Sequence, residues 1–117
     1  MPLVAAAALP HTPQLLVRPE TEDRDLVLRV HAGYAEIKRR LGAARPDVIC
    51  IVAGDHVEGF FLTSVPALAV YVGSSVSGKF DRYRYTFDVH ERLARALLEQ
   101  GIERGFDLAY SQDLALD

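Results

Sequence analysis

The apolar residues of this chain fall into short unbroken runs, separated by longer segments of helical periodicity. A run in which nearly every residue is apolar is typical of a strand covered on both faces. Four such runs predict strands, namely residues 3–9 (LVAAAAL), 48–53 (VICIVA), 67–72 (ALAVYV) and the shorter 106–111 (FDLAYS). The alanines of the first run are also compatible with a helix, but the run is short and ends at Pro10, which favours a strand.

Two segments carry apolar side chains at helical spacing. The first covers residues 23–41 and ends at Gly42, a residue type that often terminates helices. Its apolar positions are Leu26, Val30, Tyr34, Ile37 and Leu41. A second helix is expected to begin with a capping box formed by Asp88 and Glu91, and to end near Gly101.

Strands that alternate with helices predict an α/β fold, with a mostly parallel sheet and helices on both of its faces. Residues 73–78 are rich in Gly and Ser and predict a loop, whereas residues 79–87 show no definite pattern. At 117 residues, with no internal repeat or linker, the chain has the length of about one small domain.

Two histidines closely follow two of the predicted strands. His11 lies two residues after the first run, and His56 lies three residues after the second. Ligands of open parallel sheets bind beyond the carboxyl ends of the strands, so we expect both imidazoles at one crevice if these strands are neighbours. Imidazole is a common ligand of transition metals, and the pair indicates a metal site. A hydrogen-bonded loop position remains an equal alternative for each of them.

The residues near these histidines have both a structural and a chemical interpretation. Asp55 and Glu58 either cap a turn, face water or supply a carboxylate. Phe60 and Phe61 are by default core residues, although an aromatic pair beside polar ligands also walls a flat substrate. The basic and aromatic residues 82–85 form a solvated loop or bind a carboxylate or phosphate. Structural or surface positions are expected for the remaining histidines, His31 and His90.

Composition argues against several classes of function. A net charge of −3 without a basic stripe argues against binding to nucleic acid or to anionic membranes. No apolar run approaches the length of a membrane span, and the N-terminal run lacks the charged leader of a signal peptide. The single cysteine, Cys50, lies within an apolar run, so we expect a buried thiol in a reducing compartment and a cytoplasmic protein.

Several of these segments also resemble one known family. Residues 10–13 (PHTP), 46–61 (PDVICIVAGDHVEGFF) and 65–73 (VPALAVYVG) are together similar to the N-terminal part of class III extradiol ring-cleavage dioxygenases, in their catalytic (beta, LigB-like) subunit. Within the second segment, Asp-His followed by Gly-Phe-Phe most resembles the branch that cleaves 3-(2,3-dihydroxyphenyl)propionate. Residues 106–117 (FDLAYSQDLALD) resemble the point at which that family has an Asp-His-Gly motif.

The resemblance implies a non-haem Fe(II) enzyme that cleaves a catechol beside its two hydroxyl groups with dioxygen. By similarity, His11 and His56 are the two histidine ligands of the iron. Asp117 belongs to the motif that shuttles protons, and Phe61 contacts the substrate. The family's carboxylate ligand and its second catalytic histidine lie further downstream than this chain extends. Pro10 stands where the family usually has a small polar residue.

Residues 1–117 are accordingly expected to be the N-terminal part of a single extradiol dioxygenase-like α/β domain, inactive by itself. Apolar surface near residues 65–72 is then expected to associate with a second copy, with the C-terminal part or with a partner subunit. Two alternatives remain open. One is a non-catalytic α/β module, and the other is a metal-dependent hydrolase that uses the two histidines with Glu58 or Asp55.

Overall fold

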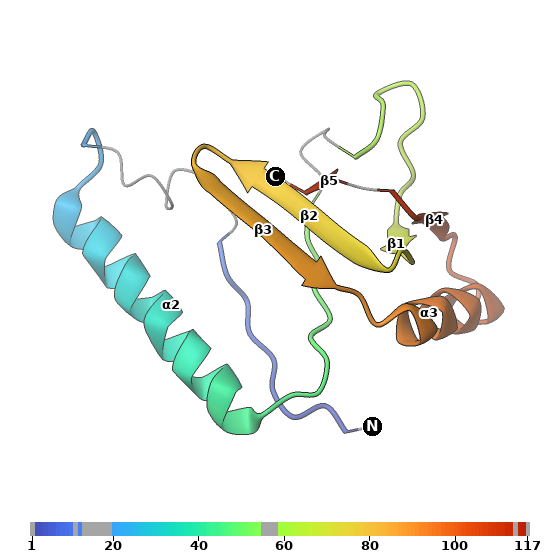
Figure 1. Ribbon diagram of the computed structural model, residues 1–117, viewed down its shortest axis with the longest axis horizontal. Coiled ribbons are helices and arrows are strands. Elements are labelled where there is room, and N and C mark those ends of the chain that lie inside the picture. The colour runs from blue at the N-terminus through green and yellow to red at the C-terminus, as the bar shows by residue number, and fades with distance from the viewer. Residues whose placement is uncertain (1, 11, 13–19, 55–58, 114, 117) are drawn as a thin grey trace. The chain divides into compact units, whose positions relative to one another are not determined.

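The computed structural model describes residues 2–10, 12, 20–54, 59–113 and 115–116 of the chain (Figure 1). The chain divides into two compact units, Met1–Ala53 and Gly54–Asp117. Neither helix of the described residues combines the length and the apolar character that a membrane span requires.

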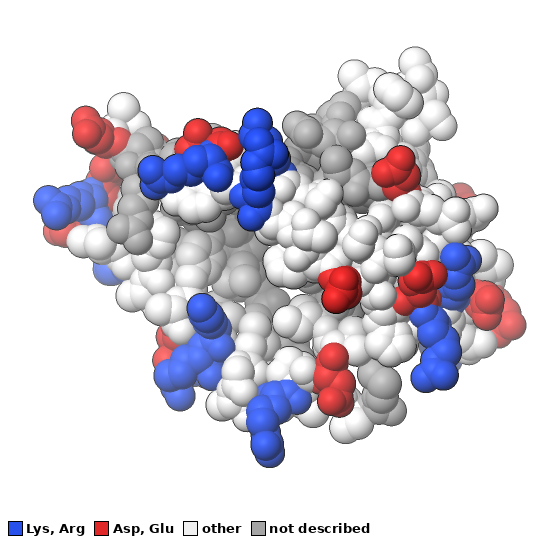
Figure 2. Space-filling view, in the orientation of Figure 1, with Lys and Arg blue, Asp and Glu red and all other residues white. Residues whose placement is uncertain are grey.

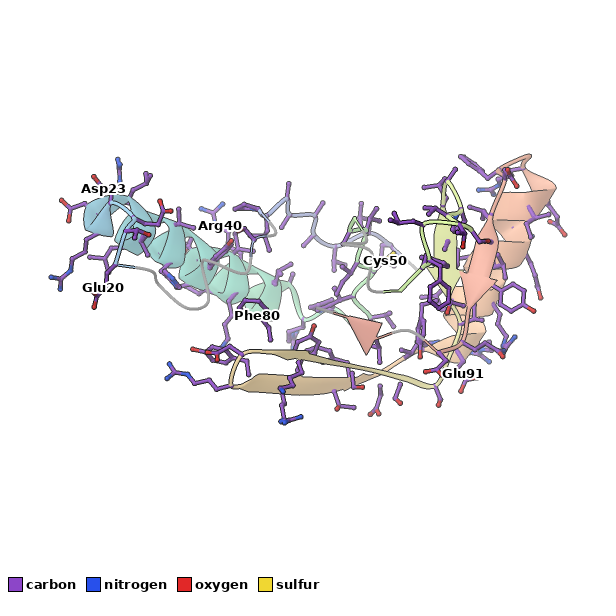
Figure 3. All side chains as sticks on the ribbon, turned by 90° about the horizontal axis from the view of Figure 1, so that it is seen from above. Glu20, Asp23, Arg40, Cys50, Phe80 and Glu91 are labelled. Carbon is purple, nitrogen blue, oxygen red and sulfur yellow. The ribbon has the colours of Figure 1, made fainter. Side chains whose placement is uncertain are left out.

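The first unit contains one long helix, α2 (Arg24–Ala44). The Asp23 carboxylate caps its beginning by accepting a hydrogen bond from the backbone N–H of Leu26 at 2.8 Å (Figure 3). The helix ends where Arg45 adopts a left-handed conformation with φ of 47°. The next residue is a proline, which disfavours helical geometry at the residue before it. The predicted helix is confirmed, but it continues through Gly42.

An exposed ion cluster lies on the surface of α2. The two oxygens of the Glu36 carboxylate each lie 2.7 Å from a guanidinium nitrogen, one on Arg39 and one on Arg40. Hydrogen bonds from Arg39, and next from Arg40, lower the pKa of the Glu36 carboxyl group from 4.5 to about 2. Basic and acidic side chains are also interspersed over the face of the molecule seen in Figure 2.

The two apolar runs of the first unit do not form the strands that their sequence predicts. Residues 2–10 and 46–54 contain neither helix nor strand. The exposed fraction reaches 77% for Ile51 and 92% for Val52. Cys50, which was expected to be buried, is exposed as well. A strand needs a neighbour for its backbone N–H and C=O groups, and the described residues pair none with these runs.

The second unit is an α/β arrangement. Its described elements are β1 (Ala69–Tyr71), β2 (Ser75–Phe80), β3 (Tyr83–Asp88), α3 (Glu91–Glu103), β4 (Ala109–Ser111) and β5 (Ala115–Leu116). β1 pairs with β4 and β2 pairs with β5, both in parallel, while β2 and β3 form an antiparallel hairpin (Figure 1). The α/β class is therefore confirmed. The predicted strands at residues 67–72 and 106–111 correspond to β1 and β4.

Residues 73–78 were predicted to form a loop, but residues 75–78 belong to strand β2 of the β2–β3 hairpin. Val76 and Phe80 of β2 are half-buried and lie opposite Phe87 and Tyr83 of β3. Apolar cross-strand pairs of this kind stabilise a hairpin regardless of the Gly and Ser residues around them. The prediction was wrong because pairing with neighbours, more than intrinsic preference, decides whether a segment becomes a strand.

Helix α3 begins with a different cap from the one that the sequence predicts. The N-cap is His90, whose Nδ1 accepts a hydrogen bond from the backbone N–H of Leu93 at 3.2 Å. Asp88, the predicted cap, is instead the last residue of β3 and lies opposite Ser75. His90 is exposed, as expected for a surface position, and it also caps the helix.

The second unit contains two parallel strand pairs, with a break between them. Between the flanking pairs, one chain segment has residues 72–76 and the other only residues 112–114, an excess of two residues. The flanking pairs are Tyr71 with Ser111 and Ser77 with Ala115. The pair of β1 with β4 and the pair of β2 with β5 therefore belong to two separate sheets, joined by connections of unequal length.

A tyrosine closes this break. The Tyr71 hydroxyl donates its one proton to the backbone carbonyl of Ser75, at 2.6 Å, and shares it with the backbone carbonyl of Gln112, at 3.1 Å. The next residue, Val72, is the one fully buried side chain among the described residues. Gly73 then passes so close to the phenol and to the Gln112 carbonyl that a side chain has no space there.

We predict that Gly73→Ala destabilises the second unit. Its Cβ would lie 2.6 Å from the Gln112 backbone oxygen, which cannot move without disturbing the β1–β4 pair. The expected cost is about 1–3 kcal/mol, as for other overpacked sites. Gly33→Ala in α2 is the matched control, because its Cβ meets nothing within 4 Å. Replacing a helical glycine should stabilise by about 0.5–1 kcal/mol. Urea unfolding measures both changes, and equal shifts would contradict the role of Gly73.

We also predict that the contribution of Glu36 to the stability of α2 persists to a lower pH than that of a carboxylate with an ordinary pKa. The lowered pKa means that the ion cluster stabilises the folded helix above the ordinary value of 4.5 and that this contribution is lost as the pH falls through about 2. Carbon-13 NMR titration of the Glu36 carboxyl group gives its midpoint. Arg39→Ala should raise the midpoint. Lys38→Ala, the removal of a neighbouring cation outside the cluster, should leave it in place, and the reverse result would contradict the prediction.

Candidate functional site

The residues predicted to carry the chemistry lie mostly outside the described part of the chain. The two candidate metal ligands, His11 and His56, lie outside it, and so does Asp117, the candidate proton-shuttling residue. The alternative carboxylate ligands, Asp55 and Glu58, lie outside it as well. The proximity of the two imidazoles therefore stays a prediction. So does the choice between the dioxygenase ligand set and the hydrolase alternative.

The segment that leads to His11 is held by a hydrogen bond from helix α2. The Tyr34 hydroxyl donates to the backbone carbonyl of Pro10 at 2.9 Å, across 24 residues of sequence. Pro10 immediately precedes His11, so this bond holds the backbone one residue before the candidate ligand. The sequence pattern counted Tyr34 only as an apolar position of the helix. A phenol on an otherwise aliphatic stripe was the signal that it also donates a hydrogen bond.

His31 packs beside this anchor. Its ring lies edge-on to the ring of Tyr34, with centroids 6.2 Å apart. Its Nε2 atom is covered and has no hydrogen-bond partner. The position supports the structural role that was expected for His31, since the imidazole fills space against the tyrosine that holds Pro10.

The two phenylalanines that follow His56, Phe60 and Phe61, differ in how far they are buried. Phe60 is half-buried, whereas the exposed fraction of Phe61 is 84%. A turn follows directly, in which the backbone N–H of Ser64 donates to the carbonyl of Phe61 at 2.8 Å. Phe61 therefore presents a free aromatic face next to the segment that contains His56. Its contact with a substrate stays a prediction.

No complete metal-binding group occurs among the described residues. Within residues 2–10, 12, 20–54, 59–113 and 115–116, no three side chains of His, Cys, Asp or Glu come together in a way that could hold an ion. Neither Cys50 nor His31 is thus part of such a group. A metal site in this chain would have to use the predicted ligands outside the described residues.

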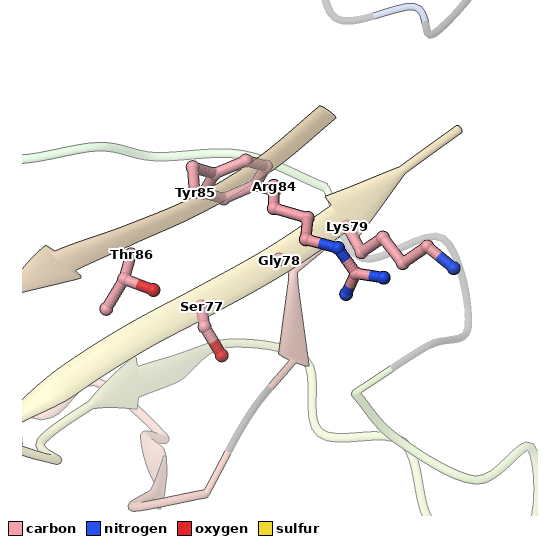
Figure 4. A pocket seen from close by; sticks show the side chains of 6 residues that line it. All are labelled: Ser77, Gly78, Lys79, Arg84, Tyr85 and Thr86. Carbon is pink, nitrogen blue, oxygen red and sulfur yellow. The ribbon is translucent and has the colours of Figure 1, made fainter. Parts of the chain in front are cut away.

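The hairpin forms a shallow cationic hollow of about 290 Å³ (Figure 4). It is lined by Ser77, Gly78, Lys79, Arg84, Tyr85 and Thr86. Lys79 and Arg84 lie directly opposite each other in the ladder and are both exposed. At the turn, the Arg82 guanidinium stands 5.4 Å from the centre of the Tyr83 ring. Residues 82–85 were expected to form a solvated loop or an anion site, and they belong to a turn and a strand.

Comparison with known proteins points to one family. The family described as the catalytic LigB subunit of aromatic ring-opening dioxygenase matches residues 5–117. A relative from Klebsiella pneumoniae (strain 342), named 2,3-dihydroxyphenylpropionate/2,3-dihydroxicinnamic acid 1,2-dioxygenase, is 33% identical over 93% of this chain and 34% of its own length. Proteins of the same name from a Rhodococcus species and from Escherichia coli O139:H28 are 27% and 30% identical over 97% and 93% of this chain.

The chain spans about a third of the length of the curated relatives that it matches, with 34% of the Klebsiella protein and 36% of the Rhodococcus protein covered. No solved structure matches it. The matched residues include both predicted histidine positions, Phe61 and the anchor formed by Tyr34 and Pro10. The family resemblance drawn from the sequence is thereby confirmed.

We predict that Tyr34→Phe loosens the segment around Pro10 without disturbing α2. The phenylalanine keeps the ring and removes only the hydroxyl donor, so the expected cost is about 1 kcal/mol. Hydrogen exchange of the Thr12 amide should become several-fold faster. Tyr110→Phe is the matched control, since the Tyr110 side chain is largely exposed, at 61%, and lies on β4. Equal exchange at Thr12 in both variants would show that the hydroxyl does not hold the segment.

Proposed function

Because the chain belongs to the family of catalytic LigB subunits of aromatic ring-opening dioxygenases, we propose that it forms part of an enzyme that opens a catechol ring with dioxygen. The observation that carries this proposal is the match over residues 5–117, since it includes both histidines predicted from the strand ends. The reaction is extradiol cleavage, in which the ring bond beside the two hydroxyl groups breaks and both atoms of dioxygen enter the product.

The proposed cofactor is Fe(II). His11 and His56 would supply two neutral imidazoles, and a carboxylate supplied from outside residues 1–117 would complete the set. Two imidazoles and one carboxylate on one face suit Fe(II) and leave open positions. When bound, the metal supplies the electron transfer that lets a catechol react with dioxygen. Asp117 would help to move the hydroxyl protons. The hydrogen bond from Tyr34 to Pro10 supports this assignment, because it positions the backbone next to His11.

The proposed substrate class is a catechol with a short acid side chain. Three relatives carry names that specify 2,3-dihydroxyphenylpropionate and 2,3-dihydroxicinnamic acid. Phe61 would cover one face of the aromatic ring, and its exposed position supports that role. We also place the enzyme in the cytoplasm, and the free Cys50 thiol is compatible with a reducing compartment.

Residues 1–117 would be the N-terminal part of one α/β domain. Two observations support this: the chain spans 34% of the Klebsiella relative, and its apolar runs are exposed where strands were expected. The most exposed large apolar side chains include Leu3, Val52, Phe61 and Leu62. Burial of such surface drives association. A second copy, a partner subunit or the rest of the domain would cover it. Val65 and Leu68 remain candidates for the contact, whereas Val72 is already buried within the second unit.

We predict that the complete protein, loaded anaerobically with Fe(II), converts 2,3-dihydroxyphenylpropionate in air to a yellow conjugated acid, followed by visible absorbance. His56→Ala should abolish both iron retention and turnover, because two remaining ligands cannot hold the ion in an open site. Phe61→Ala should raise KM about tenfold with little loss of iron. His90→Asn, which keeps a capping side chain at α3, is the control and should retain full activity.

The same preparation separates the alternatives. Full activity in His56→Ala would contradict the proposed ligand, while the 117-residue chain alone should be inactive. A complete protein that is inert to catechols but hydrolyses esters with zinc would favour the hydrolase. A protein that retains no metal at all would favour the non-catalytic module.

A further inference from the structure

Strand β3 lies at the edge of its sheet. The strand order is β3-β2-β5, so one side of β3 has no neighbour among the described residues. An exposed strand edge presents a row of backbone N–H and C=O groups that accepts another strand readily. β3 has six residues, contains no proline and carries an exposed Phe87. It therefore lacks several of the devices that keep strand edges from pairing.

The ladder shows which residues of β3 offer their backbone groups at this edge. The backbone N–H of Val89 donates to the carbonyl of Ser74 at 2.8 Å, in line with the β2–β3 register. Hydrogen-bonded and non-hydrogen-bonded pairs alternate along an antiparallel ladder. The backbone groups of Arg84, Thr86 and Asp88 therefore point away from β2, toward the free edge.

Two of these three residues are charged, and their charges select one way of pairing within the strand. A second β3, running antiparallel about a two-fold axis at Thr86, places Arg84 opposite Asp88 of the partner subunit and Thr86 opposite its own copy. Moving the axis to Arg84 or to Asp88 places like charges opposite each other. Moving it to Tyr85 leaves Arg84 opposite Thr86, and Asp88 then faces Arg82, which lies outside the strand. Moving it to Phe87 leaves Asp88 opposite Thr86, and Arg84 then has no partner within the strand. Opposite charges across strands stabilise a pair, and like charges destabilise it.

We propose that the free edge of β3 pairs with the same edge of a second copy of this chain, in the antiparallel register centred on Thr86. The contact is isologous, because each copy supplies Arg84 to one ion pair and Asp88 to the other. It is a strand addition, whose affinity comes from the backbone hydrogen bonds and whose register comes from the charges.

The arrangement within one copy adds a second reason for this partner. Arg84 lies opposite Lys79 in the hairpin, and both side chains border the cationic hollow (Figure 4). The ion pairs found among the described residues all lie on α2, so neither cation has a carboxylate partner there. Asp88 of the partner subunit brings a negative charge to this like-charged pair. A small anion in the hollow is the competing occupant.

Sedimentation equilibrium of the 117-residue chain and its charge variants tests the proposal. The wild type should self-associate reversibly to a dimer. Arg84→Asp and Asp88→Arg should each weaken self-association by about tenfold or more, since each places two like-charged pairs across the axis. An equimolar mixture of the two variants should dimerise again, because every pair across the axis is then complementary. High salt should weaken the wild-type dimer.

Controls and circular dichroism distinguish the contact from misfolding or general stickiness. Arg92→Asp makes the same charge change on α3, away from the edge, and should dimerise like the wild type. A wild type that stays monomeric would overturn the proposal. If added phosphate then shifts the NMR resonances of Lys79 and Arg84, the hollow binds a small anion and not a second copy of the chain. The proposal would equally be overturned by self-association that survives in both edge variants, or by a mixture that fails to restore the dimer.

Discussion

The break between the two parallel strand pairs is the constraint on which the second unit depends. There the Tyr71 hydroxyl shares its one proton between the carbonyls of Ser75 and Gln112, one on each chain segment that crosses the break. The hydroxyl thereby connects the chain on both sides of the break. Gly73 is needed because the Tyr71 hydroxyl and the Gln112 carbonyl leave no space for a side chain.

The regular elements were predictable where one pattern decided them. Helical periodicity located both helices, and the apolar runs located β1 and β4. The hairpin was not predictable, because residues 73–78 contain the Gly and Ser of a loop, yet residues 75–78 become part of β2 through pairing with β3, where Val76 lies opposite Phe87 and Gly78 opposite Tyr85. The cap of α3 was misplaced for a related reason: Asp88 has the right side chain for a cap, but it is the last residue of a strand.

The candidate site was predictable only as a set of positions. Two histidines after two apolar runs, together with the family pattern, made His11 and His56 candidate ligands, which stays a prediction. The hydrogen bond from Tyr34 to Pro10 was not predictable, because it joins residues 24 positions apart through a hydroxyl on an apolar helix face. Spacing along a helix shows which residues share a face, but it does not show which distant carbonyl that face meets.

The failed strand predictions and the proposed metal site have a common physical origin. Residues 3–9 and 48–53 have the composition of strands buried on both faces, yet they contain no strand and side chains such as Val52 lie exposed. In the proposed complete domain they would become neighbouring parallel strands. Their carboxyl ends lie two and three residues before His11 and His56, so burying the two runs would also bring the two imidazoles to one crevice. Iron binding would then stabilise the covered state, and covering the runs would raise the affinity for iron.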